Sequence, residues 1–354
     1  MAKKNKTQKA FIHCDDPVFK ILNPNYNTRL SMLSGIDLQD LIILIDECYL
    51  QLRNGLGFDN TVTFGLEIEF EYAMEERIRS ELNKTFHGSW RIVEDGSLKD
   101  GAEINSPILR DTEKTWGNLA RVCDIVSPLA KIDARSGGHI HIGTQTLGSD
   151  KNAWLNFIKL WAVYEKIIFR FTYGNFLTAR PSLEQYAKPV AKTFLQDYAK
   201  LKKENASLAA IISAISRQRY QAVNFNNVKR GNCHHFVKDN TIEFRCPNGT
   251  LEAPIWQNNV NLFVRLLKYS KSSCFDDDTI SKRQIINEDK YNDIKWYDEI
   301  YLEEALELCD LVFKNNFDKV YFLRQYLKSF QVNKNGKNYT KAHKLSKNGI
   351  KKIY

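Results

Sequence analysis

Within residues 60–72, apolar and acidic side chains alternate from Leu66 to Glu71, which limits what this segment can form. Glu67, Glu69 and Glu71 are separated by Ile68 and Phe70. A period of two predicts a β-strand with one acidic and one apolar face, on which Glu67 and Glu69 lie about 7 Å apart. Buried carboxylates without partners would repel one another, so the acidic face is either solvated or holds one or two divalent cations. Taken alone, the segment fits a solvent-facing strand of an antiparallel sheet equally well.

The chain has 354 residues, enough for one large domain with extensions or for two domains, and its 43% hydrophobic residues can fill a core. Apolar residues first recur at helical spacing near the N-terminus, so we expect an extension with one packing helix over residues 1–57. The main domain is expected over residues 58–275. A helical C-terminal extension with a basic tail is expected over residues 276–354.

The net charge of +9 is concentrated near the C-terminus. Residues 319–354 contain ten Lys and Arg and no Asp or Glu, so the rest of the chain is close to neutral. Such a segment is typical of a solvated end of the chain. It also fits a surface that contacts nucleic acid or an acidic partner.

Cysteine usage and hydropathy bear on the cellular setting. Seven scattered cysteines without a Cys-x-x-Cys pair predict a reducing, cytoplasmic environment and argue against a cysteine zinc site. The sequence has no apolar run of about 18 residues, so we expect no transmembrane helix and no membrane partner. The basic N-terminal residues are not followed by an apolar segment, and we therefore expect no signal peptide.

Short segments with one polar face alternate with segments of helical period. Strands are expected near residues 60–72, 90–94, 102–106, 137–143, 220–226, 233–238 and 241–246. Helices are expected near residues 74–84, 111–131, 150–171, 253–271, 290–314 and 318–330, with two more within 183–217. The strands lack the continuous apolar runs of a doubly wound parallel sheet. The predicted fold class is therefore α+β, with an antiparallel sheet backed by helices.

Three of the expected strands repeat a polar–apolar–polar pattern. They are Glu67-Ile68-Glu69, His139-Ile140-His141 and Glu243-Phe244-Arg245. Each has a simpler explanation alone, such as solvated histidines or a weak salt bridge between Glu243 and Arg245. If the strands pair in one sheet, however, their polar side chains share one face. Carboxylates with an imidazole suit Mg²⁺ or Mn²⁺ better than Zn²⁺.

Six motifs follow one another along the chain. They are Gly65-Leu-Glu-Ile-Glu-Phe-Glu, Glu94-Asp-Gly-Ser-Leu, Gly101-Ala-Glu-Ile-Asn-Ser-Pro, Gly138-His-Ile-His-Ile, Arg219-Tyr-Gln-Ala-Val-Asn and Thr241-Ile-Glu-Phe-Arg. In this order they resemble the amidoligase family, the carboxylate–amine ligases of the glutamine synthetase and glutamate–cysteine ligase fold. The resemblance spans about residues 60–271 and implies a curved antiparallel sheet. Asn240 stands where the family often has glycine, and Asn also tolerates turn geometry.

The resemblance also implies an activity and the residues that carry it. The activity would be an ATP-dependent ligase using Mg²⁺ or Mn²⁺, with two ions, that joins a small-molecule or peptide carboxylate to an amine through an acyl phosphate. The implied metal ligands are Glu67, Glu69, Glu103, His139 and Glu243. The implied ATP and phosphate contacts are His141 and Arg245, and the implied substrate contacts are Asp95, Arg219 and Asn224. The implied catalytic residues are Arg245, Glu69 and Glu243, and either Glu71 or Asp95 would accept the amine proton.

Two other functions remain open from the sequence. The same carboxylates and histidines fit a metal-dependent hydrolase that activates water without nucleotide. The basic residues of 319–354 fit a non-enzymatic nucleic-acid-binding protein. A P-loop is excluded, because Ser149-Asp150 follows the spacing from Gly143 to Gly148 where Lys-Ser/Thr is required.

Overall fold

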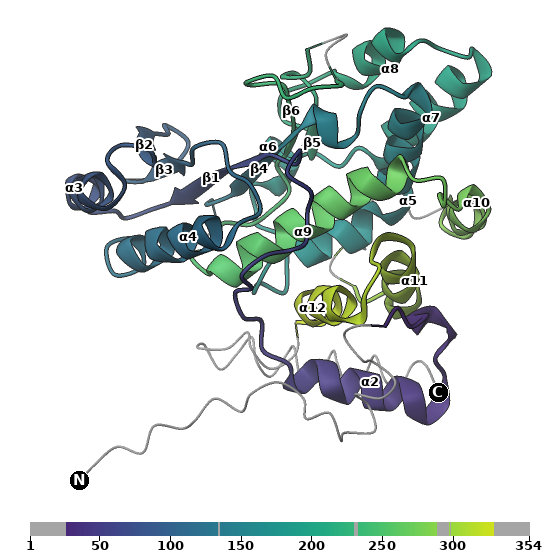
Figure 1. The fold of residues 1–354 in the computed structure, drawn as a ribbon, viewed down its shortest axis with the longest axis horizontal. Helices are drawn as coiled ribbons and strands as arrows, with labels where there is room; N and C mark the ends of the chain where they lie inside the picture. Colours follow the sequence, from purple (N-terminus) through teal and green to yellow (C-terminus); the bar gives the residue numbers. More distant parts are fainter. Residues whose placement is uncertain (1–25, 134, 230–232, 289–296, 298, 329–354) are drawn as a thin grey trace.

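The computed structural model describes residues 26–133, 135–229, 233–288, 297 and 299–328 (Figure 1). At its centre is a six-stranded sheet in the order β2-β3-β1-β4-β6-β5, with every neighbouring pair antiparallel. The strands are β1 (Phe64–Phe70), β2 (Arg91–Glu94), β3 (Ala102–Asn105), β4 (Gly138–Gly143), β5 (Val223–Asn224) and β6 (Thr241–Phe244). The predicted α+β class, an antiparallel sheet backed by helices, is confirmed.

The register of the sheet brings the three polar–apolar–polar segments side by side. Glu67 on β1 is opposite His139 on β4, and His141 is opposite Glu243 on β6. On the far side of β1, Glu69 is opposite Glu103 of β3. The intervening apolar side chains are buried: Leu66, Ile68, Ile104, Ile140, Ile142, Ile242 and Phe244. Because side chains alternate along a strand, the polar ones share the opposite face.

Two long helices, α5 (Lys151–Thr172) and α9 (Ala253–Ser270), pack beneath the sheet (Figure 1). Phe244 of β6 stacks on Phe263 of α9 with ring centroids 4.1 Å apart, and it contacts Trp161 of α5 at 5.6 Å. The aromatic side chains of α5 are fully buried. They belong to the core, where burying each large side chain stabilises the fold by about 1.5–3 kcal/mol.

Shorter helices surround this core. They are α3 (Glu75–Phe86), α4 (Glu113–Val126), η2 (Thr144–Thr146), α6 (Leu183–Tyr186), α7 (Ala191–Lys203), α8 (Leu208–Ile215) and α10 (Asp277–Ile286). The segment 183–217 thus forms three helices rather than the two predicted, because Pro189 cannot continue α6. The strand predicted over 233–238 is wrong: the chain turns there, with Asp239 at φ 62° and Asn240 N–H donating to Val237 O.

The segments before β1 and after α10 pack against each other (Figure 1). They contain η1 (Leu30–Met32), α2 (Gly35–Glu47), α11 (Leu302–Val312) and α12 (Asn316–Leu327). The helix predicted over 290–314 corresponds in its later part to α11, while residues 289–296 and 298 lie outside the described residues. The Leu30 N–H donates to Asp310 of α11 at 2.9 Å. Among the described residues, no helix combines the length and apolar character needed to cross a bilayer.

The expectation that residues 319–354 form one solvated basic end is wrong for its first ten residues. Lys319, Arg324 and Lys328 are buried in or just after α12. Lys319 Nζ contacts Asp310 Oδ1 at 2.7 Å, and Arg324 Nε donates to the Cys48 carbonyl at 2.5 Å. The charge count could not distinguish these buried cations from solvated ones. Residues 329–354 lie outside the described residues.

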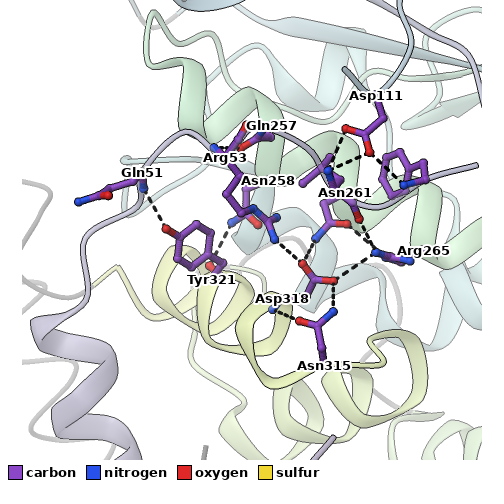
Figure 2. Close-up of polar contacts among 12 residues, drawn as sticks. Gln51, Arg53, Asp111, Gln257, Asn258, Asn261, Arg265, Asn315, Asp318 and Tyr321 are labelled. Atoms are coloured by element: carbon purple, nitrogen blue, oxygen red, sulfur yellow. Dashed lines mark hydrogen bonds and ion pairs between the residues drawn. The ribbon is translucent and has the colours of Figure 1, made fainter. Parts of the chain in front are cut away.

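Residues 51–58 form a strap that ties the N-terminal segment to α9 and α12 (Figure 2). The Gln257 side chain bonds both the N–H and the carbonyl of Arg53. The Arg53 guanidinium contacts Asp318 Oδ1 at 2.6 Å. Asp318 is 2% exposed and also accepts from Asn261 at 2.9 Å and from Arg265 at 3.4 Å. One buried carboxylate therefore joins the strap, α9 and α12.

We predict that Asp318→Ala lowers the free energy of unfolding by about 3–5 kcal/mol, because it leaves two largely buried guanidinium groups without their shared counter-charge. Chemical denaturation followed by circular dichroism measures this change. Glu81→Ala removes an exposed carboxylate paired with Lys84 and should leave the midpoint nearly unchanged. Equal midpoints for the Asp318 variant and the unmodified protein would contradict the prediction.

Candidate functional site

Glu67 lies at the centre of the polar face, between two histidines. Nδ1–H of His139 donates to Glu67 Oε2 at 2.6 Å, and Nε2–H of His141 donates to Oε1 at 2.8 Å. This geometry follows from the pairing of β1 with β4, which places the Glu67 side chain beside both members of the His-x-His pair. The other ring nitrogen of His141 lies 3.2 Å from Thr241 Oγ1.

Glu67 and the two histidines belong to a row of polar side chains that runs across the strands. The carboxylates of Glu69 and Glu103 extend this row toward β3. Glu69 is buried, accepts the backbone N–H of Gly137 through Oε2, and has Oε1 3.4 Å from His139 Nε2. Asp95, in the turn after β2, joins this end of the row. Ligand atoms of Glu69, Asp95 and Glu103 all lie within 4.8 Å of one another.

Within the described ranges, two further sets of side chains have this metal-ligand spacing. One is Glu67, Glu103 and His139, and the other is Glu67, His141 and Glu243. Glu67 and Glu103 each belong to two of the three sets. The sets therefore form one continuous row across β3, β1, β4 and β6, and its carboxylate and imidazole donors suit Mg²⁺ or Mn²⁺.

Arg245 and Asn224 hold the other end of the row. Glu243 accepts from Asn224 Nδ2 at 2.6 Å through one oxygen and from Arg245 Nη1 through the other. Arg245 Nε also donates to the carbonyl of Tyr186 at 3.1 Å. The buried Arg245 guanidinium lies 5.8 Å from the ring centroid of Tyr220. A cation is thus fixed beside the last carboxylate of the row.

The pKa values of Glu67 and Glu103 are shifted in opposite directions. Burial by itself raises the pKa of Glu67, but the hydrogen bonds from His139 and His141 outweigh it and lower the pKa below its ordinary value. Burial and the charges of Glu67, Glu69 and Asp95 raise the pKa of Glu103 to about 8. Burial lowers the pKa of His141, but the hydrogen bond to Glu67 outweighs it and raises the pKa. Negative charge at Glu103 is therefore under-compensated, and a divalent cation would offset it.

Close packing beneath the row explains one glycine of the motif. A Cβ at Gly138 would lie 2.4 Å from the Trp256 ring of α9. No side chain fits there without moving either β4 or the indole. Gly138 therefore lets the strand that carries His139 and His141 sit directly on α9.

The structure brings most of the residues singled out in the sequence into one place. The group comprises Glu67, Glu69, Glu103, His139, His141, Glu243, Arg245 and Asn224. Asp95, expected on the substrate side, lies within the metal-ligand spacing instead. Arg219 lies outside the row and is exposed, with its guanidinium 5.9 Å from the Tyr220 ring centroid.

Glu71 does not join the row. Its side chain is fully buried, and Oε1 contacts Arg135 at 2.7 Å and accepts the Lys99 N–H at 2.8 Å. Of the two carboxylates considered from the sequence as proton acceptors, only Asp95 lies beside the row. The structure also places Arg180 near Glu69. The sequence analysis did not identify Arg180 as a site residue, because it belongs to none of the motifs.

A pocket of about 330 Å³ opens beside the middle of the row, next to Glu67 and His141. Its walls come from β1, from the segment after β3 and from the turn before β6. Ile108 and Phe236 line it with apolar surface and are 51% and 46% exposed. The side chains of Asn105, Asn227 and Asp239 add polar groups. The wall of the pocket therefore carries both apolar and polar side chains.

We predict that Glu103→Gln raises the melting temperature of the metal-free protein by several degrees at pH 8 and much less at pH 5. Between the ordinary carboxyl value of 4.5 and about 8, the unfolded chain releases the Glu103 proton while the folded protein keeps it. Stability therefore falls as pH rises through this window, and glutamine removes that loss. Differential scanning fluorimetry at both pH values in EDTA measures the effect. An equal shift at pH 5 and pH 8 would contradict it.

A comparison with family models identifies the family of this chain. The family described as "Putative amidoligase enzyme" matches residues 70–267, which include Asp95, Glu103, both histidines, Glu243 and Arg245. A search of curated proteins gives no match. A solved structure titled "Crystal structure of novel glutamine synthase homolog" is similar with a TM-score of 0.40 and 10% sequence identity, covering 83% of this chain and 71% of that chain. Because the family match extends over more than half of the chain, this protein belongs to the amidoligase family.

Proposed function

We propose that this protein is an ATP- and Mg²⁺-dependent ligase that joins a carboxylate to an amine through an acyl-phosphate intermediate. The observation that carries the proposal is the continuous row of metal-ligand spacings from Asp95 to Glu243, ending at the buried Arg245. Family membership supports amide-bond formation as the reaction class.

The metal-binding residues in this proposal are Glu67, Glu69, Glu103, His139 and Glu243. Asp95 lies within the same spacing and is kept as the acceptor of the amine proton. Bound Mg²⁺ would neutralise the carboxylates and the ATP phosphates, so that an anionic substrate can approach the γ-phosphoryl group. The three overlapping sets can accommodate two ions, because Glu67 and Glu103 are each shared between neighbouring sets. Mn²⁺ fits the same donors.

Arg245 would stabilise negative charge on the transferring phosphoryl group, and His141 would contact the phosphates from the pocket side. The guanidinium is held from two directions, by Glu243 and by the Tyr186 carbonyl. A cation fixed in this way needs little reorganisation when charge develops in the transition state. Asp95 would accept the proton of the attacking amine.

The strand β6 connects the pocket to Arg245 and so gives the order in which ATP and the substrates would lie. Thr241 lines the pocket, and Arg245 lies four residues further along the chain, about 13 Å away. We place the base and ribose of ATP in the pocket, between Ile108 and Phe236. The carboxylate and amine substrates, a small molecule or a peptide, would then enter on the side of the row away from the pocket, with Arg219, Asn224 and Asp95 as their proposed contacts.

We predict that Glu69→Ala and Arg245→Ala each lower turnover at least 100-fold, because each removes charge used in phosphoryl transfer. The assay follows ADP release from Mg-ATP with pools of amino acids and peptides. Glu76→Ala, which removes an exposed carboxylate, is the matched control. Full turnover in both variants would remove the proposed roles, and turnover without nucleotide would favour the hydrolase.

We predict that Phe236→Ala raises the KM for ATP about tenfold and leaves kcat largely unchanged, because it removes stacking area worth about 1–3 kcal/mol per base without touching the reacting groups. Steady-state kinetics with varied ATP measures this change. Tyr49→Ala removes another exposed aromatic ring and should leave the KM unchanged. If the Phe236 variant has the KM of the unmodified protein, the base does not lie in this pocket.

A further inference from the structure

Arg180 is a buried cation behind the row of carboxylates. It lies between α5 and α6 and is 5% exposed. Its Nη2 donates to the carbonyl of Arg245 at 2.9 Å, and its Nη1 donates to the carbonyl of Pro247. The guanidinium therefore binds the backbone on both sides of Cys246, where the chain leaves β6.

The same guanidinium ties β6 to the start of β4. The Pro247 carbonyl that it binds also accepts the N–H of Gly138 at 3.0 Å. A Cβ at Gly137 would lie 2.9 Å from Cζ of Arg180, so the planar group rests directly against the backbone of Gly137. Gly137 is glycine for this reason, since any side chain would displace the guanidinium.

Gly137 in turn contacts Glu69, a member of the row of carboxylates. The N–H of Gly137 donates to Oε2 of Glu69, so Arg180 fixes the residue that orients this carboxylate. Arg180 also interacts electrostatically with Glu69. Burial lowers the pKa of Arg180 and the charge of Glu69 opposes this, while a guanidinium remains protonated in proteins. A permanent positive charge therefore acts on Glu69.

We propose that Arg180 is a positioning residue of the site: it fixes Glu69 through Gly137, and Arg245 through its carbonyl, in the geometry that binds metal and nucleotide. The proposal rests on the function proposed above. Arg180 has no contact with the pocket, and its influence on ligands is exerted through Glu69 and Arg245. Residues that orient metal ligands typically change metal affinity 10–100-fold when removed.

If Arg180 only stabilised the fold, its removal would have the same effects as removal of any other buried arginine bound to a backbone carbonyl. Arg324 provides that comparison, because it is 2% exposed and its Nε donates to the Cys48 carbonyl at 2.5 Å, in α12. Arg180→Met and Arg324→Met both remove a buried guanidinium and keep an unbranched apolar stem. Both are expected to lower the melting temperature, and only the first should change ligand binding.

The experiment titrates Mn²⁺ into each full-length variant, with and without ATP, and follows free Mn²⁺ by electron paramagnetic resonance. We expect Mn²⁺ affinity to fall at least tenfold in Arg180→Met and to stay within twofold in Arg324→Met. Arg180→Lys keeps the charge and should recover part of the affinity. Equal affinities in Arg180→Met, Arg324→Met and the unmodified protein overturn the inference alone, and no Mn²⁺-ATP binding by the unmodified protein overturns the proposed function as well.

A double-mutant cycle keeps the inference testable if Arg180→Met fails to fold. Gly137→Ala should lower Mn²⁺ affinity at least tenfold, because its Cβ collides with the guanidinium. In the Arg180→Lys background the collision is relieved by the thinner side chain, and the same glycine substitution should cost clearly less affinity. Additive effects in the two backgrounds overturn the coupling between Gly137 and Arg180.

Discussion

Repulsion among carboxylates is the constraint that the rest of this structure must satisfy. Glu67, Glu69, Glu103 and Asp95 converge on one face of the sheet, and Glu69 is almost completely buried. Taking such groups out of water is costly unless cations or hydrogen-bond donors compensate. The fold supplies compensation on three sides: histidines on β4, Arg245 after β6 and Arg180 behind Gly137. The compensation is weakest at Glu103, whose pKa is raised to about 8.

The antiparallel register is what turns scattered residues into one site. A shift of one residue between β1 and β4 would send the histidines to the apolar face, where Trp256 and the aromatic side chains of α5 pack. The apolar residues Ile68, Ile140 and Phe244 are therefore needed to position the polar side chains, because their burial fixes the register. Stability of the core and placement of the ligand row depend on the same strand pairs.

The site residues that lie in β-strands could be predicted from the sequence, because side chains in a strand alternate with a period of two. Glu67, Glu69, His139, His141 and Glu243 lie in strands, where alternation alone fixes the face of each side chain. Asp95 and Glu71 could not be placed in the same way. Asp95 follows a strand in a turn, where side-chain direction has no period, and Glu71 meets Arg135 only because the loop before β4 folds back. Arg180 lies in an irregular segment, and its partners are backbone carbonyls distant in sequence.

The hydrogen bonds of Glu67 affect how the row can bind a cation. Both of its oxygens already have an imidazole donor, at 2.6 and 2.8 Å. Each oxygen keeps a further lone pair for a cation, and a neutral histidine that donates through one ring nitrogen can bind a cation through the other. Glu67 therefore has hydrogen-bond compensation before any cation binds. Glu103 has the opposite character, because it gains charge compensation when a cation binds. A cation bound by the row would thus relieve more repulsion at Glu103 than at Glu67. Because Glu67 and Glu103 belong to the same set of neighbouring ligand atoms, both effects act on one ion. Binding of such an ion would be coupled to release of the Glu103 proton, because the pKa of that carboxyl is raised to about 8.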